Sequence, residues 1–263
     1  MTSRQAIVSV GGVAAFAVAV GLLFVGQSYL EKSRIRSMGS NEPELLPTVA
    51  QVPTVTSAAS AEPAGTDLGA LPSGTVALLR EGLGLLQQKK CDAALAKVNE
   101  VIASAPQNPS GYELRGSIYA EKKLWDQAAK DYQTVIETGG KASQMKFNLA
   151  ELNFMQKKYE AARPGFVALE SDPDIGDLAA YKAFLCDLWG GQDAAATQEL
   201  EAFNRVGTNA SYYFANAASL LYQHKTEEAR GRLMSAANIY APAKFRLYAA
   251  SLIGMGYLPL PEP

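Results

Sequence analysis

The chain contains few of the residues on which most enzyme chemistry depends. Its 263 residues include two cysteines and one histidine, and 24 basic residues stand against 26 acidic ones, which gives a net charge of −2. Two cysteines are too few for a disulfide framework or a cysteine-based zinc cluster. A nucleic-acid-binding domain usually carries an excess of basic residues. We therefore expect no catalytic residues, no metal, no cofactor and no nucleic-acid partner.

One long apolar segment lies near the start of the chain. Residues 6–26 carry no charge, and a helix of about 21 residues is roughly 31 Å long, close to the ~30 Å core of a bilayer. A cleavable signal peptide has a shorter apolar region that ends in a small-residue cleavage site, whereas this run continues past Ala19. Residues 1–36 are therefore predicted to form an uncleaved signal-anchor helix with a basic flank in a bacterial inner membrane.

The basic residues around this segment leave its orientation open. Arg4 precedes it, and Lys32, Arg34 and Arg36 follow it. The positive-inside rule alone favours a domain that faces the cytoplasm. A short tail with one arginine before an apolar run is instead typical of bacterial export signals. We expect a single-pass protein with a periplasmic domain, and a cytoplasm-facing domain is the alternative.

The composition changes after the anchor. Residues 37–74 are rich in Ala, Ser, Thr and Glu, contain no aromatic residue, and are interrupted by Pro43, Pro47, Pro53, Pro63 and Pro72. Such a segment cannot bury enough apolar surface to offset the entropy lost on folding. It is predicted to be a disordered, extended tether between the membrane and the following domain.

A period of 34 residues begins at Thr75. Shifting the sequence by 34 residues aligns small residues at two positions of the repeat, namely Gly82, Gly116 and Ala150 at the first and Ala94, Ala128 and Ala162 at the second. A third position holds larger apolar residues: Val98, Tyr132 and Phe166. The pattern resembles the tetratricopeptide repeat (TPR), a helix-turn-helix unit of about 34 residues. The resemblance implies an all-α solenoid, in which paired helices approach at the small residues and the large residues fill the space between pairs.

The period continues with less regularity towards the C-terminus. A fourth unit between Asp177 and Gly207 has Phe184 where a small residue is expected, and a fifth unit is regular. A last helix is predicted from Pro242, closed by Gly254, and we expect it to cap the apolar face of the final repeat. We predict about five repeats within residues 75–256, followed by a flexible tail at 257–263.

The TPR resemblance also implies where a partner binds. The first helices of TPR units line a concave face, and the period places on it Phe147, Glu151, Phe154, Tyr181, Leu185, Trp189, Phe214 and Tyr222. These residues predict an apolar groove for an amphipathic helix or an extended peptide. The alternative is that several of them are core residues, because the irregular fourth unit can turn other faces inward.

Other features have two interpretations each. Acidic residues predominate in 160–201 and basic residues in 205–246, which predicts either steering of a partner and contact between copies or plain solvated helix faces. Asp172, Asp174 and Asp177 are predicted to form a turn and helix cap rather than a calcium loop. Cys91 and Cys186 lie almost three repeats apart and are expected to be reduced core residues.

Together these features predict a non-enzymatic protein-interaction module. The architecture resembles membrane-anchored TPR subunits of bacterial secretion, pilus and envelope-assembly machines. We expect an adaptor that binds a protein partner as part of a complex in the envelope. The alternative is a self-assembling scaffold, a homo-oligomer joined through its repeat faces.

Overall fold

The computed structural model describes residues 73–207 and 209–258, and within these ranges it is entirely helical. The eleven described helices are α2 (Ser73–Gln87), α3 (Cys91–Ser104), α4 (Pro109–Glu121), α5 (Trp125–Glu137), α6 (Ala142–Met155), α7 (Tyr159–Val167), α8 (Gly176–Trp189), α9 (Asp193–Val206), α10 (Ala210–Tyr222), α11 (Thr226–Ile239) and α12 (Pro242–Gly254). None of them is long and apolar enough to cross a bilayer. The predicted anchor at 6–26 and the tether up to residue 72 lie outside the described residues, while residues 73 and 74 belong to α2.

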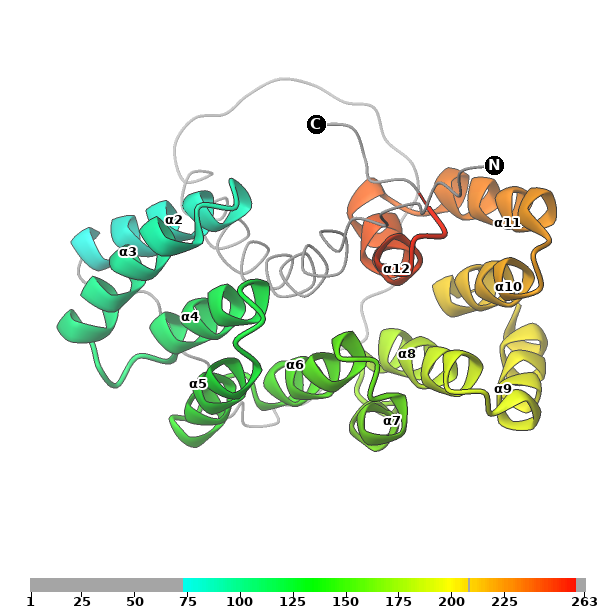
Figure 1. The fold of residues 1–263 in the computed structure, drawn as a ribbon, viewed down its shortest axis with the longest axis horizontal. Coiled ribbons are helices and arrows are strands. Elements are labelled where there is room, and N and C mark those ends of the chain that lie inside the picture. The colour runs from blue at the N-terminus through cyan, green and yellow to red at the C-terminus, as the bar shows by residue number, and fades with distance from the viewer. Residues whose placement is uncertain (1–72, 208, 259–263) are drawn as a thin grey trace, which may run out of the picture.

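The helices form five antiparallel pairs, as the 34-residue period predicts. α2 pairs with α3, α4 with α5, α6 with α7, α8 with α9, and α10 with α11, and each pair contacts the next. The pairs stack into a curved solenoid, in which α4, α6, α8 and α10 line the inner side and α5, α7 and α9 the outer side (Figure 1). The prediction of an all-α, TPR-like solenoid is confirmed for the described residues.

Small residues let the two helices of a pair approach each other. A Cβ atom at Gly116 would lie 2.7 Å from the ring of Tyr132, and one at Gly82 would lie 3.3 Å from Val98. A larger side chain at Gly116 would therefore push α4 away from α5, because a close-packed interior has no free space to receive it. Ala94 and Ala128 are fully buried on the facing helices.

The fourth repeat is irregular at the position that the sequence singles out. Phe184 is fully buried on α8, and its ring meets the edge of Phe203 on α9 with centroids 5.9 Å apart. A ring needs more room than the glycine or alanine of the other repeats. Accordingly, α8 and α9 contact each other less closely than the other pairs do.

The turns inside four of the pairs hold a residue other than glycine in the left-handed conformation. The φ angles are similar at Lys89 (60°), Lys123 (58°), Lys157 (59°) and His224 (63°). In each turn two successive backbone N–H groups donate hydrogen bonds to carbonyl groups in the last turn of the preceding helix. For example, the N–H of Lys123 donates to the carbonyl of Ala120 at 3.0 Å, and that of Leu124 to the carbonyl of Tyr119 at 2.8 Å. These backbone groups satisfy terminal carbonyls in the manner of a Schellman motif.

The last helix begins at Pro242 as predicted, but it lies on the inner side of the solenoid. α12 contacts α10 more extensively than α11, and its Tyr248 reaches Tyr181 on α8. On α11, Met234 is 59% and Ile239 55% exposed. The predicted position of the cap is thus corrected. The aromatic residues of α12 pack on α8 and α10, so the helix covers the inner side of the last repeat and leaves the outer face of α11 uncovered.

The left-handed lysines generate a stability prediction. Lys123→Gly is expected to raise the free energy of unfolding by about 0.5–1 kcal/mol, because glycine adopts positive φ without the steric cost of a Cβ atom. Urea denaturation followed by circular dichroism measures the change. Gly191 has φ +76° at the equivalent turn, with open space around it, so Gly191→Ala is the reverse control and should destabilise by a similar amount. Equal stability of Lys123→Gly and wild type would contradict the prediction.

Candidate partner-binding surface

The eight residues predicted to line a groove lie on α6, α8 and α10, but most of them are buried. The core contains six of the eight, with exposed fractions of 5% or less: Phe147, Glu151, Phe154, Tyr181, Leu185 and Phe214. Trp189 is half-buried, and Tyr222 is 40% exposed. In this conformation most of the set belongs to the core, which is the alternative that the sequence left open.

The aromatic rings on α6 point towards the outer helix of their own repeat. Phe147 and Phe154 meet Phe166 of α7 edge-on, with centroids 5.1 and 6.1 Å apart. Such contacts stabilise the pairing of α6 with α7. A partner on the inner side would therefore meet the neighbouring polar and aromatic residues rather than these two rings.

A buried ion pair joins the third and fourth repeats. Nζ of Lys182 on α8 donates to Oε1 of Glu151 on α6 at 2.8 Å, and both side chains are almost completely buried. The ammonium also lies over the ring of Phe154, 4.5 Å from its centroid. Burial lowers the pKa of Lys182, and the neighbouring Glu151 opposes the shift. The pair fixes α6 against α8, since either charge alone would be costly at this depth.

Asp177, in the first turn of α8, connects three helices. Its Oδ2 accepts a hydrogen bond from the Tyr248 hydroxyl of α12 at 2.5 Å. Its Oδ1 accepts from Nδ2 of Asn209 and from the Ser211 hydroxyl, both at 2.6 Å. Asn209 in turn caps α10 by accepting from the N–H of Tyr212. One carboxylate therefore holds the start of α10 and the middle of α12 against α8.

The other two members of the predicted acidic cluster behave differently. Oδ1 of Asp172 accepts from the N–H groups of Asp174 and Ile175 at 3.0 and 3.2 Å. This confirms the predicted turn before α8, but the predicted cap is wrong, because Ile175 holds the N-cap position and no side chain caps the helix. These backbone donors lower the pKa of Asp172, together with a hydrogen bond from Ser143, against a desolvation effect in the opposite direction.

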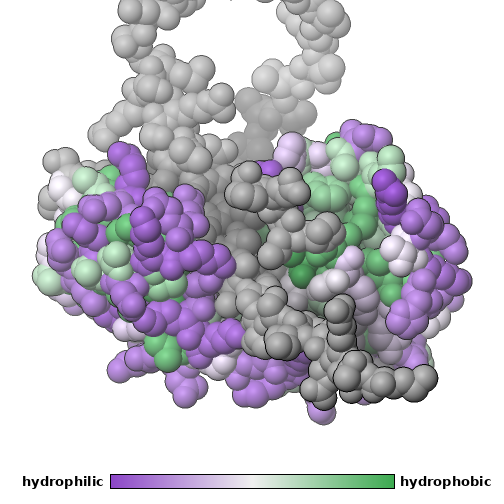
Figure 2. All heavy atoms as spheres, turned by 45° about the horizontal axis from the view of Figure 1, so that its top comes forward, coloured by the Kyte–Doolittle hydropathy of each residue, from purple (hydrophilic) through white to green (hydrophobic). Residues whose placement is uncertain are grey.

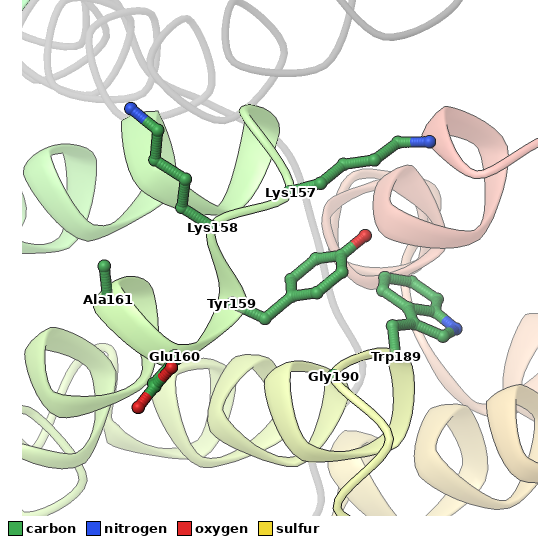
Figure 3. A pocket seen from close by; sticks show the side chains of 7 residues that line it. All are labelled: Lys157, Lys158, Tyr159, Glu160, Ala161, Trp189 and Gly190. Atoms are coloured by element: carbon green, nitrogen blue, oxygen red, sulfur yellow. The ribbon is translucent and has the colours of Figure 1, made fainter.

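An open recess of about 790 Å³ lies beside the turn between α6 and α7 and the end of α8. It is lined by Lys157, Lys158, Tyr159, Glu160, Ala161, Trp189 and Gly190. Figure 3 shows the rings of Tyr159 and Trp189 side by side, with Lys157 extending next to them towards α12. Aromatic walls with nearby ammonium groups suit a peptide that offers apolar and acidic side chains.

The segment after α12 closes one side of this aromatic cluster. Tyr257 stacks on Trp189 with centroids 6.3 Å apart, and the Tyr159 hydroxyl lies 3.6 Å from Sδ of Met255. Burial raises the pKa of Tyr159 to about 12, so its hydroxyl stays a neutral donor at physiological pH. Nε1 of Trp189 is buried and finds no partner among the described residues. Tyr257 was predicted to belong to a flexible tail and instead packs on the domain.

A second polar cluster joins α7, α8 and α9. Arg163 binds Oδ1 of Asp187 through Nε and Oε1 of Glu199 through Nη2, each at 2.7 Å. The second oxygen of each carboxylate has no hydrogen-bond partner within the described ranges. Burial and then the negative charge of Asp187 raise the pKa of Glu199, Arg163 opposes them, and the resulting pKa is about 7.

The arrangement offers binding groups rather than the parts of a metal site. Within residues 73–207 and 209–258, no three His, Cys, Asp or Glu side chains are placed to hold a metal ion. Cys91 and Cys186 are both free thiols, the second one buried. Burial raises the pKa of Cys186 and keeps it in the unreactive thiol form.

Sequence reasoning missed three residues that organise this surface: Lys182, Asp177 and Tyr248. Lys182 had a signal, since it is the one basic residue in the apolar helix Gly176–Trp189, and a buried ammonium requires a partner. Asp177 was assigned to the turn and helix cap, and its contact with Tyr248 was missed because it depends on where α12 packs.

One of three comparisons with known proteins, the family model, agrees with the repeat architecture. The family model of the tetratricopeptide repeat matches residues 79–140 and 124–174, which include α4–α7 and most of the first pair. The crystal structure of YrrB, described as a TPR protein with an unusual peptide-binding site, aligns with a TM-score of 0.42 and 16% identity over 68% of this chain and 92% of that one. A similarity this distant says nothing about what this chain binds. A comparison with curated proteins finds no match.

The buried ion pair generates a second stability prediction. Lys182→Ala leaves the Glu151 carboxylate buried without its counter-charge, and we expect a loss of about 3–5 kcal/mol in the free energy of unfolding. The double variant Lys182→Met with Glu151→Gln removes both charges and should recover most of that loss. Urea denaturation of the two variants and of wild type measures both effects. A Lys182→Ala variant as stable as wild type would show that the pair does not fix α6 against α8.

The raised pKa of Glu199 generates a prediction about pH. An unfolded glutamate titrates near 4.5 and the folded one near 7, so the folded state binds the proton more tightly between these values. Stability from this residue is complete below about pH 4.5 and is lost as the pH rises through about 7. Melting temperatures between pH 5 and 8 should therefore fall less steeply for Glu199→Gln than for wild type. Glu201→Gln, an exposed neighbour on α9, is the control and should follow the wild-type profile.

Proposed function

We propose that the protein is a non-enzymatic TPR adaptor that binds a helix or peptide of a protein partner on the inner side of its solenoid. The observation that carries the proposal is the recess between Tyr159 and Trp189, an open aromatic site beside the inner face of a repeat array. Stacked repeats of this kind present extended concave binding surfaces. The exposed ammonium groups of Lys157 and Lys158 favour a partner segment with acidic residues next to apolar ones.

The proposal includes attachment to a membrane. Its support is the uncharged run at 6–26 and the proline-punctuated residues that follow it. A tether of this composition would keep the domain near the bilayer while it searches for its partner. We propose the inner membrane of a bacterial envelope, with the domain in the periplasm.

One observation favours a second function, self-assembly. The outer face of α11 leaves Met234 and Ile239 more than half exposed, and apolar side chains in that position normally contact a following repeat. A second copy of the chain could cover this face. Self-assembly would make the protein a scaffold rather than an adaptor.

Crosslinking tests the adaptor proposal. The tagged full-length chain is crosslinked in its native membranes, solubilised in detergent and analysed by mass spectrometry. We expect a stoichiometric protein partner with wild type and at least a tenfold lower recovery with Trp189→Ala, because that substitution removes one wall of the recess. Trp125→Ala is the matched control. Trp125 is half-buried at the start of α5, away from the recess, and its loss should leave recovery unchanged.

The other outcomes are equally informative. Equal recovery of the partner with wild type and with Trp189→Ala would rule out the recess as the binding site. Crosslinked ladders that contain only the bait would favour the scaffold, and they should then disappear when Met234 is replaced by a charged residue.

A further inference from the structure

α12 occupies the inner face of the solenoid in the way that a bound helix would. It lies on the inner side of α8 and α10 (Figure 1), and Figure 2 shows hydrophobic residues gathered on the inner side of the arm that carries these helices, while its outer surface is mainly hydrophilic. The second half of α12 is enclosed on all sides, because the five consecutive residues 248–252 are buried. Tyr248, Ala249 and Leu252 belong to the same hydrophobic cluster as Tyr181 of α8 and Phe214 of α10, so α12 occupies the place that a bound helix would take.

Two aromatic residues of α12, three positions apart, make the central contacts. The ring of Phe245 meets Phe214 of α10 with centroids 5.2 Å apart. Tyr248 lies between Phe214 and Tyr181, with centroids 5.4 and 5.5 Å away. Its hydroxyl donates to Asp177. Tyr181 and Phe214 were both predicted from the sequence to bind a partner, and both are covered by α12.

The contact between α12 and the solenoid leaves polar groups unsatisfied. The Tyr181 hydroxyl and the Ser251 hydroxyl are buried, and neither finds a hydrogen-bond partner among the described residues. Each unsatisfied group weakens the docking of α12, because its hydration is lost without replacement. A different helix that offers an acceptor to Tyr181 would make a better-satisfied contact on the same surface.

α12 also has little stability of its own. It has 13 residues, no side-chain N-cap and no acidic residue in its first turn, and an isolated helix of this length is marginal in water. Lys244 lies in the first turn, where a positive charge opposes the helix dipole. Tyr240 and Ala241, which join it to α11, are extended. The helix therefore depends on its docking site and is connected by a segment that can act as a hinge.

We propose that the surface of α8 and α10 beneath α12 is a binding site for an amphipathic helix of the protein partner, and that α12 is an internal competitor which leaves when the partner binds. The partner helix presents two aromatic residues three positions apart and no carboxylate on that face, because Asp177 already supplies the acceptor. This inference rests on the proposed adaptor function and specifies the class of ligand and its regulation. It also explains why Tyr181 and Phe214 of the predicted groove are covered: the chain's own helix lies on them.

A synthetic peptide of residues 241–258, labelled with fluorescein, tests the competition. Its binding to the detergent-solubilised full chain is measured by fluorescence anisotropy. We expect Tyr248→Ala to bind the peptide at least tenfold more tightly than wild type, because the weakened internal helix no longer competes at its high effective concentration. Tyr112→Ala is the matched control. This variant also loses one ring and one hydrogen bond, to the carbonyl of Pro106 in the loop between α3 and α4, and it should bind the peptide as weakly as wild type.

A second variant keeps the test decisive if Tyr248→Ala fails to fold. A protease site inserted between Tyr240 and Ala241 allows α12 to be severed after the chain has folded. The labelled peptide should then exchange into the cut protein and not into the uncut one. Equal binding to cut and uncut chains, or binding to neither, would overturn the proposal.

Partner recovery separates this inference from the proposed function. Tyr248→Ala should increase recovery of the crosslinked partner at least fivefold over wild type. Equal recovery from the two chains would overturn the competition while the adaptor function stands. Exchange of the peptide without recovery of any partner would retain the helix-binding surface and reject the adaptor function.

Discussion

Every part of this domain depends on one constraint: a helix pair can bury its apolar surface only against the next pair along the chain. The small residues at Gly82 and Gly116 bring paired helices together, and the rings of Tyr132 and Phe166 fill the space beside them. No repeat has a core of its own, so the stability of the domain depends on the interfaces between repeats. The interface between the third and fourth repeats is exceptional because the Lys182–Glu151 ion pair lies within it. This pair gives α6 and α8 a fixed register where Phe184 has loosened the regular packing of α8 on α9.

The C-terminal half differs in character from the N-terminal half. Its core is the largest hydrophobic cluster of the described residues and extends from Phe147 to Leu252, whereas the first repeats share two smaller ones. The extra aromatic residues come from the inner side, where Tyr181, Phe214 and Tyr248 meet. The inner face of the first repeats has no such cover from α12. A partner that replaces α12 would therefore gain most of its apolar contact at the fourth and fifth repeats.

The helix pairs could be predicted from the sequence because small residues recur every 34 positions, at the points where the backbones of paired helices come close together. The candidate site was less predictable. A rotation of a helix by a fraction of a turn decides whether Phe147 faces a groove or Phe166, and periodicity cannot resolve that angle. The position of α12 was missed because no following repeat determines where a last helix must pack.

The uncovered outer face of α11 has a consequence for the growth of the array. In a solenoid the last repeat normally ends in a polar surface, which prevents further stacking. Here Met234 and Ile239 stay exposed among the mostly polar residues of α11, and each offers apolar contact to one more helix pair. Since α12 is already displaced to the inner side, a longer version of this protein could arise by duplicating a repeat after Tyr240 without rebuilding the existing core. The packing at this end of the described solenoid therefore does not fix the number of repeats.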